Sequence, residues 1–330
     1  MDFDLTDDQK EIKNVARELL SARSPLSKVR EAAEAAEAAV YDPGLWDEIV
    51  ALGWPGIAVA ERYGGQDLGA VELAVLLEEL GYACAATPFF STAVAAAVIQ
   101  AAGNDEQRER WLPGLASGEL TAGVGAADLA ADAEGAAVVV LLDGDEARLV
   151  ADPQTEALVT IDPTRRFARV DGDGEGLQGG AAPRVLGAIA AEIVGICQRA
   201  LEMTLEYVKE RKQFGVPVGS FQAVSHRCAQ MLLYTESARS TAYYAAWAAD
   251  ADPTRLAEAS ALAAAAAATG GREVTGSAIQ AHGGIGFTWE ADVHWFYKRA
   301  QLDAALLGGA SRHHVSLAHA AAARAVAPAG

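Results

Sequence analysis

The sequence has few cysteines, few aromatic residues and a shortage of basic charge. Its 330 residues include only three cysteines, Cys84, Cys197 and Cys228, which form no CxxC pair and no metal-like spacing. So sparse and odd a count favours reduced thiols over a disulfide framework and gives no sign of a metal site. Only 26 Lys and Arg oppose 45 Asp and Glu, a net charge of −19. This balance argues against nucleic acid or an anionic membrane as a partner, and a phosphorylated ligand would need a local basic cluster.

Long hydrophobic runs are missing as well. The acidic start of the chain, residues 1–8, lacks the basic and apolar regions of a signal peptide. The most apolar stretches, residues 91–103 and 259–270, are shorter than the roughly 20 residues that cross a bilayer. We therefore expect a soluble cytoplasmic protein.

Apolar material for folding is plentiful, because 51% of the residues are hydrophobic. A chain of this length exceeds the roughly 250–300 residues at which a single core stops growing, so two or three structural units are expected. Residues 1–118 show helical spacing and predict an N-terminal helical domain. Within it, Thr6 and Gln9 have the spacing of a capping box, and Gly81 follows an apolar helical face as a possible C-cap.

The pattern changes between residues 119 and 180, which predict a shortened β domain. Residues 138–142 form a β-branched run, an Asp-Gly turn follows, and residues 148–151 return as a second strand. Residues 158–161 and 166–170 are two further strand candidates.

From residue 181 to 330 the chain is helical again and rich in alanine, which lets helices approach closely. The last long helix should end at Gly283-Gly284. The predicted fold class is therefore α+β, mostly α: an N-terminal helical domain, a reduced middle β domain and a C-terminal four-helix bundle.

Two segments of the C-terminal part could contact an anionic cofactor. Arg211-Lys-Gln-Phe-Gly215, followed by Phe221-Gln222, combines an arginine at a helix end, an aromatic ring and a glycine that permits close backbone approach. Gln280-Ala-His-Gly-Gly-Ile-Gly286 leaves backbone N–H groups free to meet an anion. Each segment, taken alone, is equally typical of a helix end followed by a tight turn.

Together, these two blocks resemble the C-terminal half of the acyl-CoA dehydrogenase family, in which similar blocks occur about as far apart. Other segments resemble the family in order along nearly the whole chain: Leu5-Thr-Asp-Asp-Gln9, Leu52-Gly-Trp-Pro-Gly-Ile57, Tyr63-Gly-Gly65, Glu79-Leu-Gly81, Thr87-Pro88 and Leu112-Pro-Gly-Leu-Ala-Ser-Gly-Glu119. The resemblance implies a helical domain, a β domain and a four-helix bundle, the same order that the sequence pattern predicts.

In that family a glutamate removes the α-proton of an acyl-CoA while the β-hydrogen passes as hydride to FAD. The resemblance assigns the first block to the FAD pyrophosphate and its neighbourhood, and the second to the adenosine end, with both blocks reaching the flavin of an adjacent subunit. The residues it assigns to FAD are Arg211, Gln213, Phe214, Gln222, Gln280, Gly283 and Gly284.

The chain departs from the family where proton removal takes place. The usual catalytic glutamate position falls on Leu307, and the alternative position on the preceding helix falls on Val185. Glu192 lies two turns further on, about 10 Å away, and is interpreted as a charge on the helix face. The segment Leu120–Asp128 also lacks the proline and serine with which the family holds the flavin ring.

These matches and losses favour the short, base-free subunit of a heteromeric acyl-CoA dehydrogenase. A longer partner would carry the glutamate and the acyl-CoA substrate, in an α2β2 assembly like those that act on steroid side chains, and the isolated chain would be inactive. Two alternatives stay open: a complete homomeric dehydrogenase with an unrecognised base such as Glu192, or a scaffold or acyl-CoA-binding relic without turnover. His282 could touch the cofactor or be structural, and Glu290 with Asp292 are interpreted as solvated or inter-helix charges.

Overall fold

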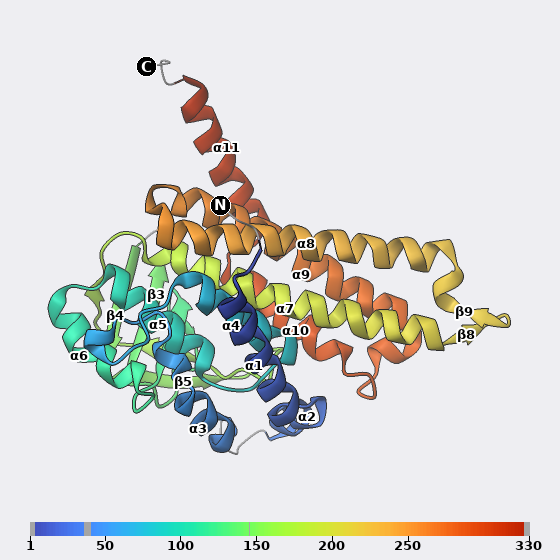
Figure 1. Ribbon diagram of the computed structural model, residues 1–330, viewed down its shortest axis with the longest axis horizontal. Coiled ribbons are helices and arrows are strands. Elements are labelled where there is room, and N and C mark those ends of the chain that lie inside the picture. The colour runs from blue at the N-terminus through green and yellow to red at the C-terminus, as the bar shows by residue number, and fades with distance from the viewer. Residues whose placement is uncertain (1–3, 36–40, 145, 327–330) are drawn as a thin grey trace.

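The structure is a computed structural model that describes residues 4–35, 41–144 and 146–326. Short N-terminal helices and a small sheet pack on one half of a set of long C-terminal helices, and the last helix projects beyond the body (Figure 1). This arrangement confirms the predicted α+β, mostly α, fold. The domain boundaries at 118 and 180 stay a prediction, and residues 1–3 and 327–330, at the ends of the first and third predicted domains, lie outside the described residues.

In the described residues of the N-terminal part there are six α-helices. The first begins as predicted, because the Gln9 N–H donates to Thr6 Oγ1 (3.2 Å) and the Thr6 N–H donates to Gln9 Oε1 (2.9 Å). The six helices are α1 (Asp7–Arg23), α2 (Leu26–Glu34), α3 (Pro43–Ala51), α4 (Ala70–Ala83), α5 (Phe89–Ala102) and α6 (Asp105–Ala116).

Helix α4 is central and crosses the first long C-terminal helix, α7 (Ala181–Glu210), at very close range. A Cβ added at Gly81 would lie 2.1 Å from the Glu192 carbonyl oxygen, and one added at Gly195 would lie 1.8 Å from the Glu78 carbonyl oxygen. The prediction of Gly81 as a C-cap is therefore wrong. The helix continues to Ala83, and this glycine is present because the crossing leaves no room for a side chain.

Among the residues that the structure describes, seven strands form one mixed sheet in the order β5-β6-β2-β1-β3-β4-β7. The predicted hairpin is confirmed: Val140 pairs with Leu149 in an antiparallel register. The predicted strand at residues 158–161 is wrong in position, because the strand runs from Gln154 to Leu158 and Val159 is fully exposed. The strands are β1 (Ala122–Ala126), β2 (Leu129–Ala131), β3 (Val138–Asp143), β4 (Glu146–Ala151), β5 (Gln154–Leu158), β6 (Phe167–Asp171) and β7 (Glu175–Gly176).

Strand β3 is apolar at every position from Val138 to Leu142 because both of its faces are buried. Val138 and Val140 belong to the main core, whereas Val139 and Leu141 belong to a small second core formed by the sheet itself. On the main-core side α5 packs on β1, and the Ala122 N–H donates to Thr92 Oγ1 (3.2 Å).

The C-terminal helices pack lengthwise, with α9 contacting α7, α8, α10 and α11. A small hairpin of β8 (Lys212–Gln213) and β9 (Val216–Pro217) joins α7 to α8 at one end of this bundle (Figure 1). The other C-terminal elements are α8 (Gln222–Ala251), α9 (Leu256–His282), η5 (Gly283–Phe287), α10 (Val293–Leu306) and α11 (Ala310–Val326). Among the residues described, no helix is both long and apolar enough to cross a bilayer.

Candidate functional site

The two predicted cofactor blocks meet at the hairpin end of the bundle. Tyr207, one turn before the end of α7, stacks on His282, the last residue of α9, with ring centroids 4.5 Å apart. This contact brings the Arg211 block and the Gln280 block to the same end of the bundle, although about 70 residues separate them in the sequence. His282 is itself buried, and its Nδ1 lies 2.8 Å from the Ala278 carbonyl oxygen, so its ring is held against α9.

The hairpin turn presents an aromatic ring to solvent. Phe214 has a φ of +51° and is followed by Gly215 with a φ of +84°, which places both residues in the left-handed region of a tight turn. The Phe214 side chain is 93% exposed, and its ring meets that of Phe221 edge to face at 6.3 Å. A phenylalanine held in this strained and exposed position contributes little to folding of the chain and is available for a contact outside it.

All seven residues that the resemblance assigns to FAD are exposed: Arg211, Gln213, Phe214, Gln222, Gln280, Gly283 and Gly284. A Cβ at Gly283 or Gly284 would meet nothing within 4 Å, so the backbone there is open to a ligand. Within the described part of the chain, neither Arg211 nor Lys212 takes part in an ion pair. This end of the bundle therefore offers a guanidinium without an ion pair in the described chain and several exposed side-chain amides, a donor set that suits a pyrophosphate.

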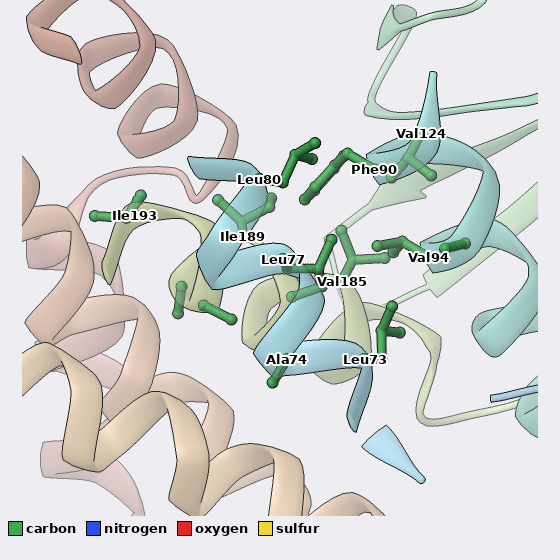
Figure 2. Close-up of a cluster of buried hydrophobic side chains, with 14 of the residues drawn as sticks. Leu73, Ala74, Leu77, Leu80, Phe90, Val94, Val124, Val185, Ile189 and Ile193 are labelled. Carbon is green, nitrogen blue, oxygen red and sulfur yellow. The ribbon is translucent and has the colours of Figure 1, made fainter. Parts of the chain in front are cut away.

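The two positions where the family carries its catalytic glutamate are part of the hydrophobic core. Val185 and Leu307 are each 1% exposed. Figure 2 shows Val185 between Leu77 of α4 and Val94 of α5, surrounded by apolar side chains. Neither aliphatic side chain can accept a proton, and neither position is open to a substrate.

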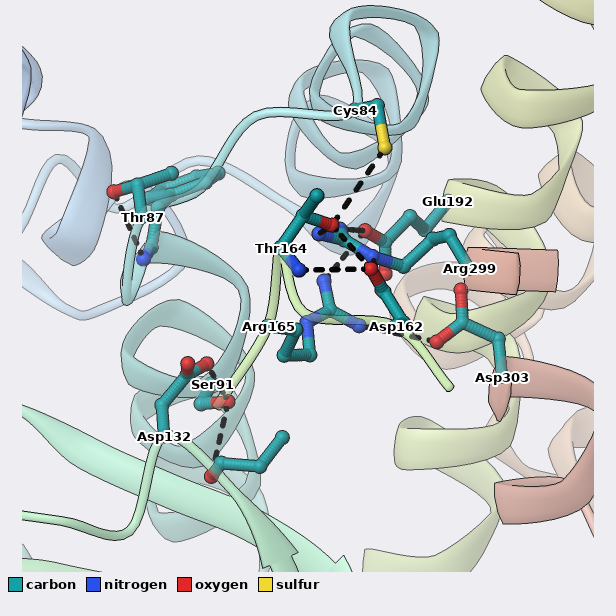
Figure 3. Close-up of polar contacts among 12 residues, drawn as sticks. Cys84, Thr87, Ser91, Asp132, Asp162, Thr164, Arg165, Glu192, Arg299 and Asp303 are labelled. Carbon is teal, nitrogen blue, oxygen red and sulfur yellow. Dashed lines mark hydrogen bonds and ion pairs between the residues drawn. The ribbon is translucent and has the colours of Figure 1, made fainter. Parts of the chain in front are cut away.

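Glu192, the acidic residue nearest to Val185 along α7, belongs to a buried ionic cluster. Its Oε1 accepts hydrogen bonds from Arg165 Nη2 (2.5 Å) and Arg299 Nη1 (3.0 Å), and the residue has no exposed surface. Figure 3 shows these side chains, together with those of Asp162 and Asp303, pointing toward one another. The interpretation of Glu192 as a helix-face charge is therefore wrong: it is fully buried and joins α7 to α10 and to the loop before β6.

This buried cluster contains more carboxyl groups than cations. Arg165 and Arg299 face the carboxyl groups of Asp162, Glu192 and Asp303. Burial raises the pKa of Asp303 well above its usual range, and the neighbouring Glu192 raises it further. The raised pKa of Asp303 reflects this excess of buried carboxyl groups over cations.

Burial alone would lower the pKa of Arg299, but Asp162 and Glu192 outweigh burial and raise it. Burial also raises the pKa of the nearby Cys84 thiol to about 12, so this thiol is not a nucleophile.

Sequence reasoning missed this cluster. A signal was present, because Arg299 and Asp303 stand four residues apart on an apolar helix, a spacing that places both on one buried face. The partners Asp162 and Arg165 come from a loop far away in the sequence, and only the fold brings them together.

The segment Leu120–Asp128 lacks the proline and serine with which the family holds the flavin ring. Most of this segment lies in the centre of the sheet. Its residues 122–126 form β1, paired with β2 on one side and β3 on the other. A Cβ at Gly125 would lie 2.0 Å from the Leu129 carbonyl oxygen. The backbone groups of β1 that would hold a ring are therefore already engaged in the sheet.

Two further expectations concern charges near the start of α10. Asp292 forms an ion pair with Arg30 of α2 (2.7 Å), an inter-helix role, and Glu290 is exposed. His294 is buried with neither ring nitrogen hydrogen-bonded. Among the residues that the structure describes, no three His, Cys, Asp or Glu side chains cluster as metal ligands.

Comparison with known proteins agrees with this geometry. Residues 6–119 match the family described as "Acyl-CoA dehydrogenase, N-terminal domain", and residues 187–322 match "Acyl-CoA dehydrogenase, C-terminal domain". Acyl-CoA dehydrogenase IpdE2 of Mycolicibacterium smegmatis is 34% identical over 276 residues, which cover 81% of this chain and 85% of that protein. The chain belongs to the acyl-CoA dehydrogenase family. The sequence resemblance is thereby confirmed for both helical parts.

Two solved structures extend the similarity over the whole chain. A chain of the structure "Tcur3481-Tcur3483 steroid ACAD G363A variant" superposes with a TM-score of 0.87 and 28% identity, covering 97% of this acyl-CoA dehydrogenase family member and 99% of that chain. A chain of the ChsE4-ChsE5 complex from Mycobacterium tuberculosis has a TM-score of 0.85 at 24% identity, with complete coverage of both chains. The second similarity shows the fold alone.

Proposed function

We propose that this chain is the non-catalytic subunit of a heteromeric acyl-CoA dehydrogenase. Its partner is a longer family member that carries the catalytic glutamate and the acyl-CoA substrate, in an α2β2 assembly. The proposal is carried by one observation. The residues that the resemblance assigns to FAD are exposed at one end of the bundle, whereas the two positions it assigns to the base are buried aliphatic side chains.

FAD is the cofactor that the exposed donor set fits. When bound, FAD accepts the hydride that leaves the β-carbon of the acyl group. In our proposal Arg211 pairs with the pyrophosphate, and Gln213, Phe214 and Gln222 hold the same region. Gln280 and the open backbone at Gly283 and Gly284 hold the adenosine end. These residues position the cofactor and move no proton.

The names of two similar solved structures support a proposal for the substrate class. One similar solved structure is named a steroid acyl-CoA dehydrogenase pairing Tcur3481 with Tcur3483, and another is a complex of ChsE4 with ChsE5. We propose a bulky CoA ester, such as a steroid side-chain ester, as the substrate of the assembled enzyme. This step rests on analogy, because the acyl group would bind in the partner.

The structure argues against a homomeric enzyme that uses Glu192 as its base. A general base must come within hydrogen-bond reach of the substrate proton, but Glu192 has no exposed surface and accepts hydrogen bonds from two arginines. The Glu192→Gln variant tests this point. We expect the co-expressed complex to keep its turnover per folded molecule, whereas a catalytic glutamate would lose nearly all of it.

Co-expression with a longer acyl-CoA dehydrogenase encoded next to this chain tests the main proposal. We expect flavin and acyl-CoA desaturation only in the complex, and neither in the chain alone. Desaturation by the purified chain alone would contradict the proposal. Absence of flavin and activity in every combination would favour a scaffold instead.

The Arg211→Ala variant tests the cofactor contact directly. Loss of a charge-assisted hydrogen bond costs about 1.5–3 kcal/mol, which corresponds to roughly 10-fold to 150-fold weaker FAD retention. Flavin released on dilution of the complex, measured by fluorescence, reports this change. Arg272→Ala is the matched control, because Arg272 is an exposed arginine of α9 that pairs with the adjacent Glu273. Equal retention in the two variants would remove Arg211 from the site.

A further inference from the structure

A cavity of about 150 Å³ lies between the N-terminal helices and the bundle, away from the residues assigned to FAD. Helices α4 and α5 form one side, and α7, α8 and the start of α9 form the other. Its walls are mostly aliphatic and buried: Leu73, Leu77, Val94, Ala188, Ala245 and Leu256. An apolar cavity of this size has room for a molecule about as large as benzene.

One polar group lines this cavity without a partner. Ser260 of α9 has no exposed surface, and its hydroxyl makes no hydrogen bond to any residue that the structure describes. Buried hydroxyls elsewhere in the bundle, those of Thr204 and Thr275, donate to the carbonyl oxygen four residues earlier. The Ser260 hydroxyl makes no such bond. Its burial therefore destabilises the fold unless a molecule in the cavity forms a hydrogen bond with it.

A cationic side chain also lines this cavity. Arg184 of α7 is partly buried and donates to the Gly180 carbonyl oxygen (3.1 Å), and in the described chain it forms no ion pair. Asp250 also lines the cavity, but both of its carboxylate oxygens accept the Ala70 N–H at the N-terminus of α4 (3.0 and 2.8 Å). The Arg184 guanidinium is therefore left with donors to spare next to an apolar cavity.

We propose that this cavity is a binding site for a small carboxylic acid with a benzene-sized apolar body and a hydrogen-bonding group at its far end. Arg184 pairs with the carboxylate at the edge, the aliphatic walls enclose the body, and Ser260 bonds to the group at the buried end. This site is independent of the proposed flavin contacts, because none of its lining residues belongs to them.

Three related probes separate these contributions: 4-hydroxybenzoate, benzoate, which lacks the hydroxyl, and phenol, which lacks the carboxylate. Binding to the full-length chain is followed by ligand-observed NMR and calorimetry. We expect 4-hydroxybenzoate to bind most tightly. Arg184→Gln should weaken both acids about tenfold or more and leave phenol unchanged, because only the acids pair with the guanidinium. Ser260→Ala should weaken 4-hydroxybenzoate and phenol but not benzoate.

A third variant tests the volume of the cavity without removing a polar group. A Cβ at Gly187 would lie 3.6 Å from the Ala245 Cβ and 3.8 Å from Ser260 Oγ, ordinary contact distances. Gly187→Ala should therefore fold at least as stably as the native chain while weakening all three probes. Gly276→Ala, where an added Cβ meets nothing within 4 Å, is the control and should leave binding unchanged.

Three results would overturn the proposal. Failure of all three probes to saturate the native chain would show that no such site exists. Phenol binding as tightly as the two acids would show an apolar void without anion recognition. Acid binding that survives both Arg184→Gln and Gly187→Ala would place the ligand elsewhere.

Discussion

Arg299 is the residue whose removal should destabilise the protein most through charge alone. Its guanidinium is fully buried and donates to Asp162, Glu192 and Thr164. In Arg299→Met the apolar part of the side chain is retained, but one cation, Arg165, then faces three carboxyl groups. Breaking a buried ion pair by removing one partner costs about 3–5 kcal/mol. At about 2 °C per kcal/mol for a chain of this size, the melting temperature should fall by about 6–10 °C.

The pH dependence of this loss gives a second measurement. Arg299 lowers the pKa of Asp303, so removing Arg299 raises that pKa further and favours the protonated form in the folded state. A group whose pKa is raised on folding stabilises the protein below its unfolded pKa, and that stability is lost as the pH rises through its folded pKa. The melting deficit of Arg299→Met should therefore be larger at pH 8 than at pH 5.

Arg272→Met serves as the control, because this arginine is exposed and its removal should change stability by no more than about 0.5 kcal/mol. The double variant Arg299→Met/Asp162→Asn should lose less than the sum of the two single losses, because the two groups are paired. Differential scanning calorimetry measures all of these variants. If Arg299→Met melted as the control does, or if its deficit did not change with pH, the cluster would not hold the fold as we describe.

Three other predictions follow from the same structure. Gly195→Ala should lower the free energy of unfolding in urea by several kcal/mol, because its Cβ would lie 1.8 Å from the Glu78 carbonyl oxygen. Gly187→Ala, at a roomier helix position, should instead raise it by about 0.5–1 kcal/mol. Equal effects of the two variants would contradict the close crossing of α4 and α7. Burial, and to a lesser extent the charge of Lys298, lowers the pKa of His294 to about 4 from its ordinary 6.5. As the pH falls, the unfolded chain therefore takes up this proton before the folded chain does. The free energy of unfolding should decrease by up to about 3 kcal/mol between pH 6.5 and pH 4. His294→Leu should show a shallower loss over this range, and an unchanged slope would refute the assignment. Phe214→Ala should weaken flavin retention in the complex without lowering the melting temperature, because the ring is 93% exposed; a lowered melting temperature would mean that the ring supports the fold instead.

Local chemistry made much of the fold predictable from the sequence. The capping box at Thr6 and Gln9 needs only four residues, and the hairpin of β3 and β4 needs only two apolar runs and an Asp-Gly turn. The end of α9 at Gly283 was predicted for the same reason, because a glycine with positive φ stops a helix locally.

The errors arose where a distant element decides the outcome. Gly81 looked like a helix terminus because nothing in its neighbourhood reveals that α7 crosses there. Glu192 looked like a surface charge because its arginine partners are 27 and 107 residues away. The residues assigned to FAD are a different case, since the structure brings them together at one exposed end, and their role stays a prediction until a complex is examined.

The aliphatic residues at positions 185 and 307 have a consequence for stoichiometry. In the proposed assembly, reaction centres are counted by partner chains only, so a complex of four polypeptides holds two of them. Titration with a tight-binding product analogue should then reach its end point at one equivalent for every two chains. An end point of one equivalent per chain would mean that this polypeptide has a working centre of its own.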